Sequence, residues 1–171
     1  MSNLSMPSRN IILTGFMGTG KTTVGQIVAD YIRWRFVDAD NEIVTRFGKP
    51  IPQIFEEEGE AAFRRYERII CQSLVAGNKQ VIATGGGMVV DPVNRDLLLS
   101  SGLVVCLTAD ADVIKFRIEQ ETDRPLAGQW RELYTKRQSI YAELPYQIDT
   151  TTSSPQEIAE KVIALWRTSS T

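Results

Sequence analysis

The sequence predicts an α/β fold in which helices cover both faces of a parallel sheet. Short apolar segments typical of strands alternate with longer amphipathic segments typical of helices along the chain. Residues 103–108 are apolar up to the last position, as expected for a strand buried on both faces. A chain of 171 residues falls within the usual size of one domain, so we expect a single domain over residues 1–171.

The first half of the chain is expected to hold two strands and four helices. The strands are predicted at residues 10–14 and 36–37, and the helices at residues 21–33, 41–47, 52–57 and 60–75. Val24, Ile27 and Val28 recur at the three- and four-residue spacing of a helix face, and the same periodicity marks the longest helix. Gly48 and Pro50 separate the two short helices, since both residues interrupt helical structure.

The second half continues the alternation with three more strands. They are predicted at residues 80–84, 103–108 and 146–149, with helices from residue 92 onward and at residues 111–119, 130–142 and 155–167. Asp91 followed by Pro92 is typical of an N-cap with proline at the first helical position, and Ser154 with Pro155 repeats the pattern. The chain therefore predicts five strands in a βα arrangement.

The charge balance and the hydropathy exclude several classes of partner. Lysine and arginine total 19 against 21 aspartate and glutamate residues, giving a net charge of −2. This balance argues against nucleic-acid binding and against a polybasic membrane anchor. The longest apolar run has five residues, whereas a helix needs about 20 to cross a bilayer, so we expect no contact with a membrane.

The absence of histidine and the scarcity of cysteine exclude several kinds of catalytic and metal-binding site. Without histidine the chain has no imidazole base, no Ser-His-Asp triad and no histidine-based metal site. Cys71 and Cys106 stand in apolar surroundings without CxxC spacing, which predicts buried, reduced thiols. Residues 1–10 contain no apolar segment typical of a signal peptide, so we expect a cytoplasmic protein.

Residues 15–22 match the phosphate-binding pattern G-x-x-x-x-G-K-[ST] without mismatch. The match stands between a predicted strand and a predicted helix, which is the context that this loop requires. Its glycines let backbone N–H groups point inward around an anion at the helix N-terminus. Lys21 is then placed to reach the β- and γ-phosphates, and the Thr22 hydroxyl to ligate Mg²⁺. The sequence therefore predicts a protein that binds a nucleoside triphosphate.

Two other nucleotide-binding classes fit less well. The glycine order is G-x-x-G-x-G, not the G-x-G-x-x-G of dinucleotide-binding folds. A small GTPase needs N-K-x-D to read guanine, but Val81 stands where the aspartate of this pattern belongs after Asn78 and Lys79. No predicted strand is followed by the D-x-x-G that a GTP switch also needs.

A second cluster of candidate residues follows the other predicted strands. Asp38 and Asp40 come directly after the second strand, at the edge where parallel sheets bind ligands. One carboxylate can serve Mg²⁺ and the other a substrate hydroxyl; alternatively, the pair is a helix N-cap and a solvated aspartate. Residues 85–87, three glycines after the third strand, either expose backbone N–H groups to a ligand or form a plain turn. Arg64 and Arg65 by themselves suggest a solvated helix face.

Taken together, these motifs resemble one family closely. The segments GFMGTGKTT, DAD, IFEEEGEAAFRRYE, TGGG, RPL and KRQSIY follow each other in this order. In that order and at similar spacing they are similar to shikimate kinase, a member of the nucleoside-monophosphate-kinase-like group of P-loop proteins. The resemblance covers about residues 9–166, and its combined motifs are far more specific than the phosphate loop alone.

The resemblance implies a P-loop three-layer fold with a five-stranded parallel sheet. It also implies a substrate-binding segment at about residues 39–67 and a mobile lid at about residues 121–129. The implied activity is phosphoryl transfer from ATP, with Mg²⁺, to the 3-hydroxyl of shikimate on the way to chorismate and the aromatic amino acids. We expect shikimate and ATP as the partners and a monomeric protein.

At the nucleotide end, the resemblance assigns roles residue by residue. The phosphate and Mg²⁺ contacts fall on Gly15, Gly18, Thr19, Gly20, Lys21, Thr22 and Thr23. Asp38 falls where the family supports the Mg²⁺ shell, and Arg117 where an arginine stacks on adenine. Arg124 matches the lid arginine that faces the transferred phosphate.

At the substrate end, Asp40 falls where the family binds substrate hydroxyls and where it can act as a base. Arg64 and Arg137 match the pair that grips the substrate carboxylate, which suits forked guanidinium groups. The remaining substrate-site matches are Phe55, Phe63, Gly85, Gly86 and Gly87, together with Glu67 as the residue that orients the arginine. Lys21, Asp38, Asp40 and Arg124 are therefore the expected catalytic residues.

The sequence departs from the family pattern in its lid. Only 12 residues separate Arg124 from Arg137, several fewer than the family's usual number, which puts lid closure and catalytic efficiency in question. Two other functions remain open at this point. One is a different small-molecule P-loop kinase, for gluconate or a nucleoside monophosphate. The other is a non-catalytic homologue that binds nucleotide. The intact Lys21, Asp40, Arg64 and Arg124 argue against it, whereas the short lid argues mildly for it.

Overall fold

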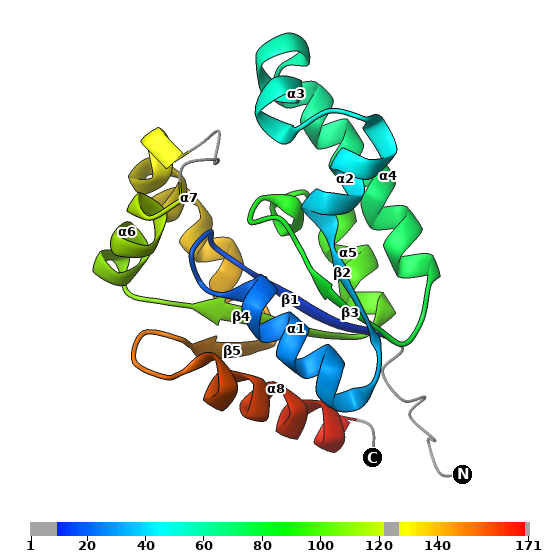
Figure 1. Ribbon diagram of the computed structural model, residues 1–171, viewed down its shortest axis with the longest axis vertical. Helices are drawn as coiled ribbons and strands as arrows, with labels where there is room; N and C mark the ends of the chain where they lie inside the picture. Colours follow the sequence, from blue (N-terminus) through cyan, green and yellow to red (C-terminus); the bar gives the residue numbers. More distant parts are fainter. Residues whose placement is uncertain (1–9, 122–126, 170–171) are drawn as a thin grey trace.

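A five-stranded parallel sheet with the strand order β2-β3-β1-β4-β5 forms the centre of the protein (Figure 1). The computed structural model describes residues 10–121 and 127–169. The strands are β1 (Asn10–Gly15), β2 (Arg35–Asp38), β3 (Gln80–Ala83), β4 (Leu103–Thr108) and β5 (Tyr146–Asp149). Each adjacent pair runs parallel, and the predicted α/β fold with five parallel strands is confirmed.

Helices cover both faces of this sheet. They are α1 (Lys21–Ile32), α2 (Ala39–Phe47), α3 (Ile51–Glu58), α4 (Glu60–Ala76), α5 (Pro92–Ser101), α6 (Ala111–Glu119), α7 (Trp130–Ala142) and α8 (Pro155–Ser169). Two short 3₁₀ helices, η1 (Met88–Val90) and η2 (Ala127–Gln129), lie in the connections. Among the described residues, no helix is long and apolar enough to cross a membrane.

The core divides into two apolar layers because side chains alternate along each strand. In β1, Ile11 and Leu13 face the layer that α1 and α8 cover, whereas Ile12 faces the layer beneath α4, α5 and α7. Both cysteines, Cys71 and Cys106, are buried in this second layer, as their apolar surroundings predict.

The predicted elements all occur, with small differences at their ends. Two helices differ by two residues: α8 ends at Ser169, beyond the predicted residue 167, and α2 begins at Ala39, before the predicted start at 41. The carboxylate of Asp38 accepts hydrogen bonds from the backbone N–H groups of Asp40 and Asn41, which stabilises the extra residues as a first turn.

The strand register brings three chain segments to one edge of the sheet. Ala83 pairs with Leu13 on one side and with Asp38 on the other. The segments that follow β1, β2 and β3 therefore emerge next to one another at the carboxyl ends of the strands. Figure 1 shows α2 and α3 projecting from this edge on one side, with α6 and the start of α7 on the other.

A tight backbone contact next to β4 provides a test of this packing. A methyl group in place of the Gly102 hydrogen would overlap the backbone of Asn10, whereas one on Gly128 would meet no atom within 4 Å. We expect Gly102→Ala to lower the free energy of unfolding by about 1–3 kcal/mol, because neither backbone can move without disturbing the β1–β4 pairing.

Urea unfolding of the two alanine variants measures this difference. Gly128→Ala is the matched control, since it adds the same methyl group in open space and should change the free energy of unfolding by less than about 0.5 kcal/mol. Equal stability of the two variants would show that the Asn10 contact is not tight.

Candidate active site

The phosphate loop between β1 and α1 has the backbone conformation that its glycines allow. Gly15, Gly18 and Gly20 have φ angles of 128°, 79° and 94°. Residues that carry a Cβ atom rarely adopt these φ angles, so the glycines are required for the curvature of the loop. Gly20 directly precedes α1, which places the N–H groups of its first turn at the mouth of the loop.

Lys21 and Thr19 bond to the carbonyl groups of the loop itself. The Lys21 Nζ donates to the carbonyl oxygens of Gly15 and Phe16, both at 2.9 Å. The Thr19 hydroxyl is buried and donates to the Phe16 oxygen at 2.7 Å. The ammonium group is thus held at the loop, within reach of an anion bound there.

Asp38 uses its two carboxylate oxygens for different purposes. Oδ1 caps α2, and Oδ2 accepts a hydrogen bond of 3.0 Å from the Thr22 hydroxyl. The sequence left a helix cap and a metal-site carboxylate as alternatives for Asp38. In the structure the cap occupies one oxygen and leaves the other beside the phosphate loop.

The oxygen atoms of Thr22 and Asp38 suit Mg²⁺ better than a metal ion whose ligands all come from the protein. In residues 10–121 and 127–169, no group of three or more Asp, Glu, Cys or His residues is placed to hold a metal ion. Thr22 and Asp38 provide one hydroxyl and one carboxylate, both hard oxygen donors. Mg²⁺ is commonly bound in this way, with water and substrate phosphates completing its six ligands.

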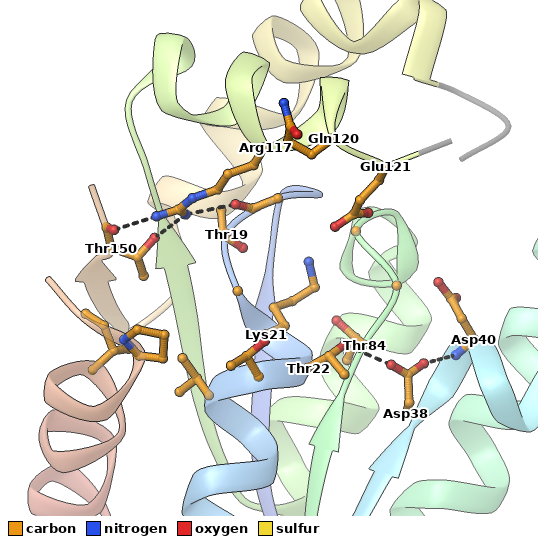
Figure 2. A pocket seen from close by; sticks show the side chains of 18 of the residues that line it. Thr19, Lys21, Thr22, Asp38, Asp40, Thr84, Arg117, Gln120, Glu121 and Thr150 are labelled. Atoms are coloured by element: carbon orange, nitrogen blue, oxygen red, sulfur yellow. Dashed lines mark hydrogen bonds between the residues drawn. The ribbon is translucent and has the colours of Figure 1, made fainter. Parts of the chain in front are cut away.

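A cavity of about 920 Å³ connects these groups (Figure 2). The phosphate loop and the first turn of α1 line its centre, through Thr19, Lys21, Thr22 and Thr23. On one side it reaches Asp38, Asp40, Gly85 and Gly86, and on the other Arg117 and the loop after β5. Residues from both ends of the chain thus share one space large enough for a nucleotide and a small substrate.

Arg117 connects the phosphate loop to the loop after β5. Its guanidinium donates to the carbonyl oxygen of Gly18 at 2.9 Å, and to the carbonyl oxygen and the hydroxyl of Thr150 at 3.0 and 3.2 Å (Figure 2). The guanidinium is a planar group at the wall of the cavity. The sequence pointed to Arg117 but did not indicate that it bonds to these two loops.

The glycines at 85–87 are required because charged side chains fill the space beside them. A Cβ atom on Gly85 would lie 2.8 Å from an Asp40 oxygen and 3.2 Å from a Glu67 oxygen. One on Gly86 would lie 3.3 Å from Arg137 Nη1, and one on Gly87 would overlap the Arg64 guanidinium. The three-glycine segment, called the glycine loop below, is therefore a contact surface for ionisable groups and more than a plain turn.

Glu67 holds this group of charges together from within α4. It is 2% exposed, and its Oε2 accepts a 2.6 Å hydrogen bond from Arg64 Nη1. Burial raises the pKa of the Glu67 carboxyl to about 6, although the charges of Arg64 and Arg137 act in the opposite direction and Asp40 in the same one. Arg64 also donates to Glu60 at 3.1 Å, so its guanidinium is fixed from two sides.

The remaining predicted substrate residues lie behind the glycine loop. Phe55 and Phe63 contact each other, with their ring centroids 4.8 Å apart. Arg137 is 6% exposed and lies over the Phe16 ring at 5.9 Å. Arg64 and Arg137 are not among the residues that line the cavity, but both contact the glycine loop, whose Gly85 and Gly86 do line it. Arg124 and most of the predicted lid lie outside the described residues.

Sequence reasoning missed residues at both ends of the site. Thr150, Ser153 and Pro155 line the nucleotide end. They could have been found from the rule that loops after parallel strands meet at one edge, applied to the last strand. Tyr141, whose hydroxyl bonds to Gly86, was also missed. Its four-residue spacing from Arg137 was the available signal.

Comparisons with known proteins identify a close group of relatives. The family model described as shikimate kinase matches residues 17–167. The shikimate kinase of Geobacter sulfurreducens is 42% identical over 173 residues, covering 96% of each chain. The solved shikimate kinase of Acinetobacter baumannii, in complex with shikimate, is 35% identical with a TM-score of 0.89 and covers 96% of this chain and 95% of that one.

A gluconokinase from Sinorhizobium meliloti, by contrast, is 19% identical, with a TM-score of 0.62 over 95% of this chain and 94% of that one. That likeness shows a common fold alone. The family model spans most of the chain, and relatives above 30% identity span nearly all of it. On this basis the chain belongs to the shikimate kinase family.

Proposed function

We propose that the protein transfers the γ-phosphoryl group of ATP to the 3-hydroxyl of shikimate. The observation that carries the proposal is the single cavity that joins the phosphate loop to Asp40 and the glycine loop. A phosphate donor and a hydroxyl acceptor bound at its two ends would meet beside Lys21. Membership of the shikimate kinase family supports the choice of substrate.

At the nucleotide end, the N–H groups of the phosphate loop and of the first turn of α1 would bind the phosphates. Lys21 would exchange its bonds to two loop carbonyls for bonds to the β- and γ-phosphate oxygens. Thr23 and Thr19 flank this position, and Arg117 offers its guanidinium plane to the adenine ring. Pro155 faces the same part of the cavity from the start of α8.

Thr22 and Asp38 are the residues that would hold Mg²⁺. Their oxygens lie 3.0 Å apart beside the loop, and Asp38 is already oriented through its cap of α2. Bound Mg²⁺ would offset negative charge on the β- and γ-phosphates. The cap means that Asp38 needs no reorganisation to present its second oxygen.

At the substrate end, Asp40 would accept the proton of the 3-hydroxyl as the new O–P bond forms and ADP leaves. It lies in the first turn of α2, lines the cavity and contacts the glycine loop. Arg64 and Arg137 would bind the carboxylate on the far side of the ring, with the apolar pair Phe55 and Phe63 beside them. A triol carboxylate has the hydroxyls and the negative charge that this set can bind.

We further propose that one domain contains all of these parts and acts as a monomer. Residues 39–67 would be the substrate-binding segment and residues 121–129 the lid. Arg124 is assigned to the transferred phosphate from its sequence motif alone.

An ADP-release assay with ATP and Mg²⁺ tests the reaction. We expect turnover with shikimate to exceed turnover with quinate, gluconate and nucleoside monophosphates by at least about 100-fold. Quinate has a saturated ring with an added hydroxyl and gluconate is an open chain, so neither places its carboxylate and its hydroxyls where shikimate does, and nucleoside monophosphates have no carboxylate. A Lys21→Ala preparation controls for contaminating kinases. Faster turnover of any other acceptor would refute the assignment.

Arg64→Lys tests how the substrate carboxylate is recognised. The change replaces a bidentate fork by a point charge, so KM for shikimate should rise by about tenfold or more while KM for ATP stays within about twofold. Arg65→Lys is the matched control, because Arg65 is the exposed neighbour on the same helix. A parallel rise in both KM values would assign Arg64 to the nucleotide site or to the fold.

The raised pKa of Glu67 predicts a pH dependence of stability. The pKa of this carboxyl is 4.5 in the unfolded chain and about 6 in the folded protein, so the folded protein binds the proton more tightly. The stabilisation by this proton is complete below pH 4.5 and is lost as the pH rises to 6. Between pH 4.5 and pH 6, the free energy of unfolding of the wild type should therefore fall by about 2 kcal/mol relative to that of Glu67→Gln.

Urea unfolding of both proteins from pH 4 to pH 7 measures that difference. Subtracting the Glu67→Gln curve removes the contributions of other titrating groups, since both proteins share them. A difference that stays constant across the interval would mean that Glu67 ionises in the folded protein as readily as in the unfolded chain.

A further inference from the structure

The Tyr141 hydroxyl joins α7 to the glycine loop. Tyr141 is 2% exposed, and its O–H donates a hydrogen bond of 2.6 Å to the carbonyl oxygen of Gly86. Arg137 lies one helical turn earlier on α7, so both side chains reach the glycine loop from the same helix.

Gly86 and Arg137 belong to two parts of the proposed substrate site that must be aligned, and Tyr141 bonds to Gly86 from the helix that carries Arg137. Arg137 Nη1 lies 3.3 Å from the position that a Cβ atom on Gly86 would take, so guanidinium and loop are already in contact. The Arg137 guanidinium also lies over the Phe16 ring at 5.9 Å. The hydrogen bond from Tyr141 holds Gly86, and with it the glycine loop, against the helix that carries Arg137.

We propose that Tyr141 is a positioning residue for the substrate carboxylate, acting through Arg137 and Gly86. The inference rests on the proposed function, in which Arg137 binds that carboxylate. Tyr141 need not touch the substrate. Its hydroxyl holds the glycine loop against α7, and the loop in turn limits the orientations of the Arg137 guanidinium, so less conformational freedom is lost when the substrate binds.

The chemistry of the phenol suits this purpose. Burial raises the pKa of Tyr141 to about 12, so the hydroxyl keeps its proton at any working pH and always donates to Gly86. Phenylalanine would fill nearly the same volume. It would leave the Gly86 carbonyl without this donor, and the glycine loop would be free to move away from Arg137.

Tyr134 provides a matched control on the same helix. Its hydroxyl also donates to a backbone carbonyl, that of Ala109, at 3.3 Å, and its ring packs edge-on against Phe16. Tyr134→Phe therefore removes a comparable hydrogen bond from α7 without touching Gly86 or Arg137. Any general loss of stability in this helix should appear in both variants.

Steady-state kinetics with shikimate and ATP distinguish positioning from stability. Tyr141→Phe should raise KM for shikimate on the order of tenfold, with kcat and KM for ATP within about twofold of wild type, and Tyr134→Phe should change none of the three. With the methyl ester of shikimate, which lacks the anionic carboxylate, Tyr141→Phe and wild type should have equal KM values. An unchanged KM for shikimate in Tyr141→Phe, or an equal rise in Tyr134→Phe, would overturn the inference.

Amide hydrogen exchange without substrate tests the positioning of the glycine loop separately from the reaction. The Gly87 N–H belongs to the same peptide group as the Gly86 carbonyl, so its exchange should quicken in Tyr141→Phe and stay unchanged in Tyr134→Phe. Unchanged exchange in both variants would refute the positioning role of Tyr141 even if the enzyme phosphorylates shikimate. Faster exchange in Tyr141→Phe alone would support it even if the proposed substrate were wrong.

Discussion

The parallel register of β1, β2 and β3 is the constraint on which the rest of the site depends. Ala83 stands between Leu13 and Asp38, so β2 and β3 end level with each other, and β1 continues two residues further to Gly15. The phosphate loop, the aspartate pair and the glycine loop then begin at the same edge of the sheet, on strands about 5 Å apart. A one-residue slip would turn every side chain of the shifted strand to the opposite layer, and the apolar residues on both faces prevent it.

The glycine loop depends on that register and in turn determines where the charges lie. Asp40, Glu67, Arg64 and Arg137 all occupy space that a Cβ atom in the loop would claim. Burying ion pairs such as Arg64–Glu67 rarely adds stability, because desolvation offsets most of their attraction. Their arrangement is better explained by orientation, since each guanidinium is fixed before a carboxylate arrives.

Asp38 illustrates how one residue can satisfy a structural and a functional reading at once. Its Oδ1 caps the N-terminus of α2, which directly follows β2, and its Oδ2 accepts a hydrogen bond from the Thr22 hydroxyl across the site. The local pattern favours a cap and also permits a ligand, and no local rule can choose between them. The choice depends on how far α1 lies from β2, which is a property of the packed sheet.

Local patterns in the sequence determined the strands, the helices, the phosphate loop and, by resemblance to a family, most of the candidate residues. Apolar periodicity and positive-φ glycines act within a few residues, so they can be recognised without the fold. Only the tertiary structure decided that Arg117 bonds to Gly18 and Thr150, and that Tyr141 bonds to Gly86. These contacts join residues 33 to 99 positions apart, and their existence depends on helix packing and strand order that no short segment encodes.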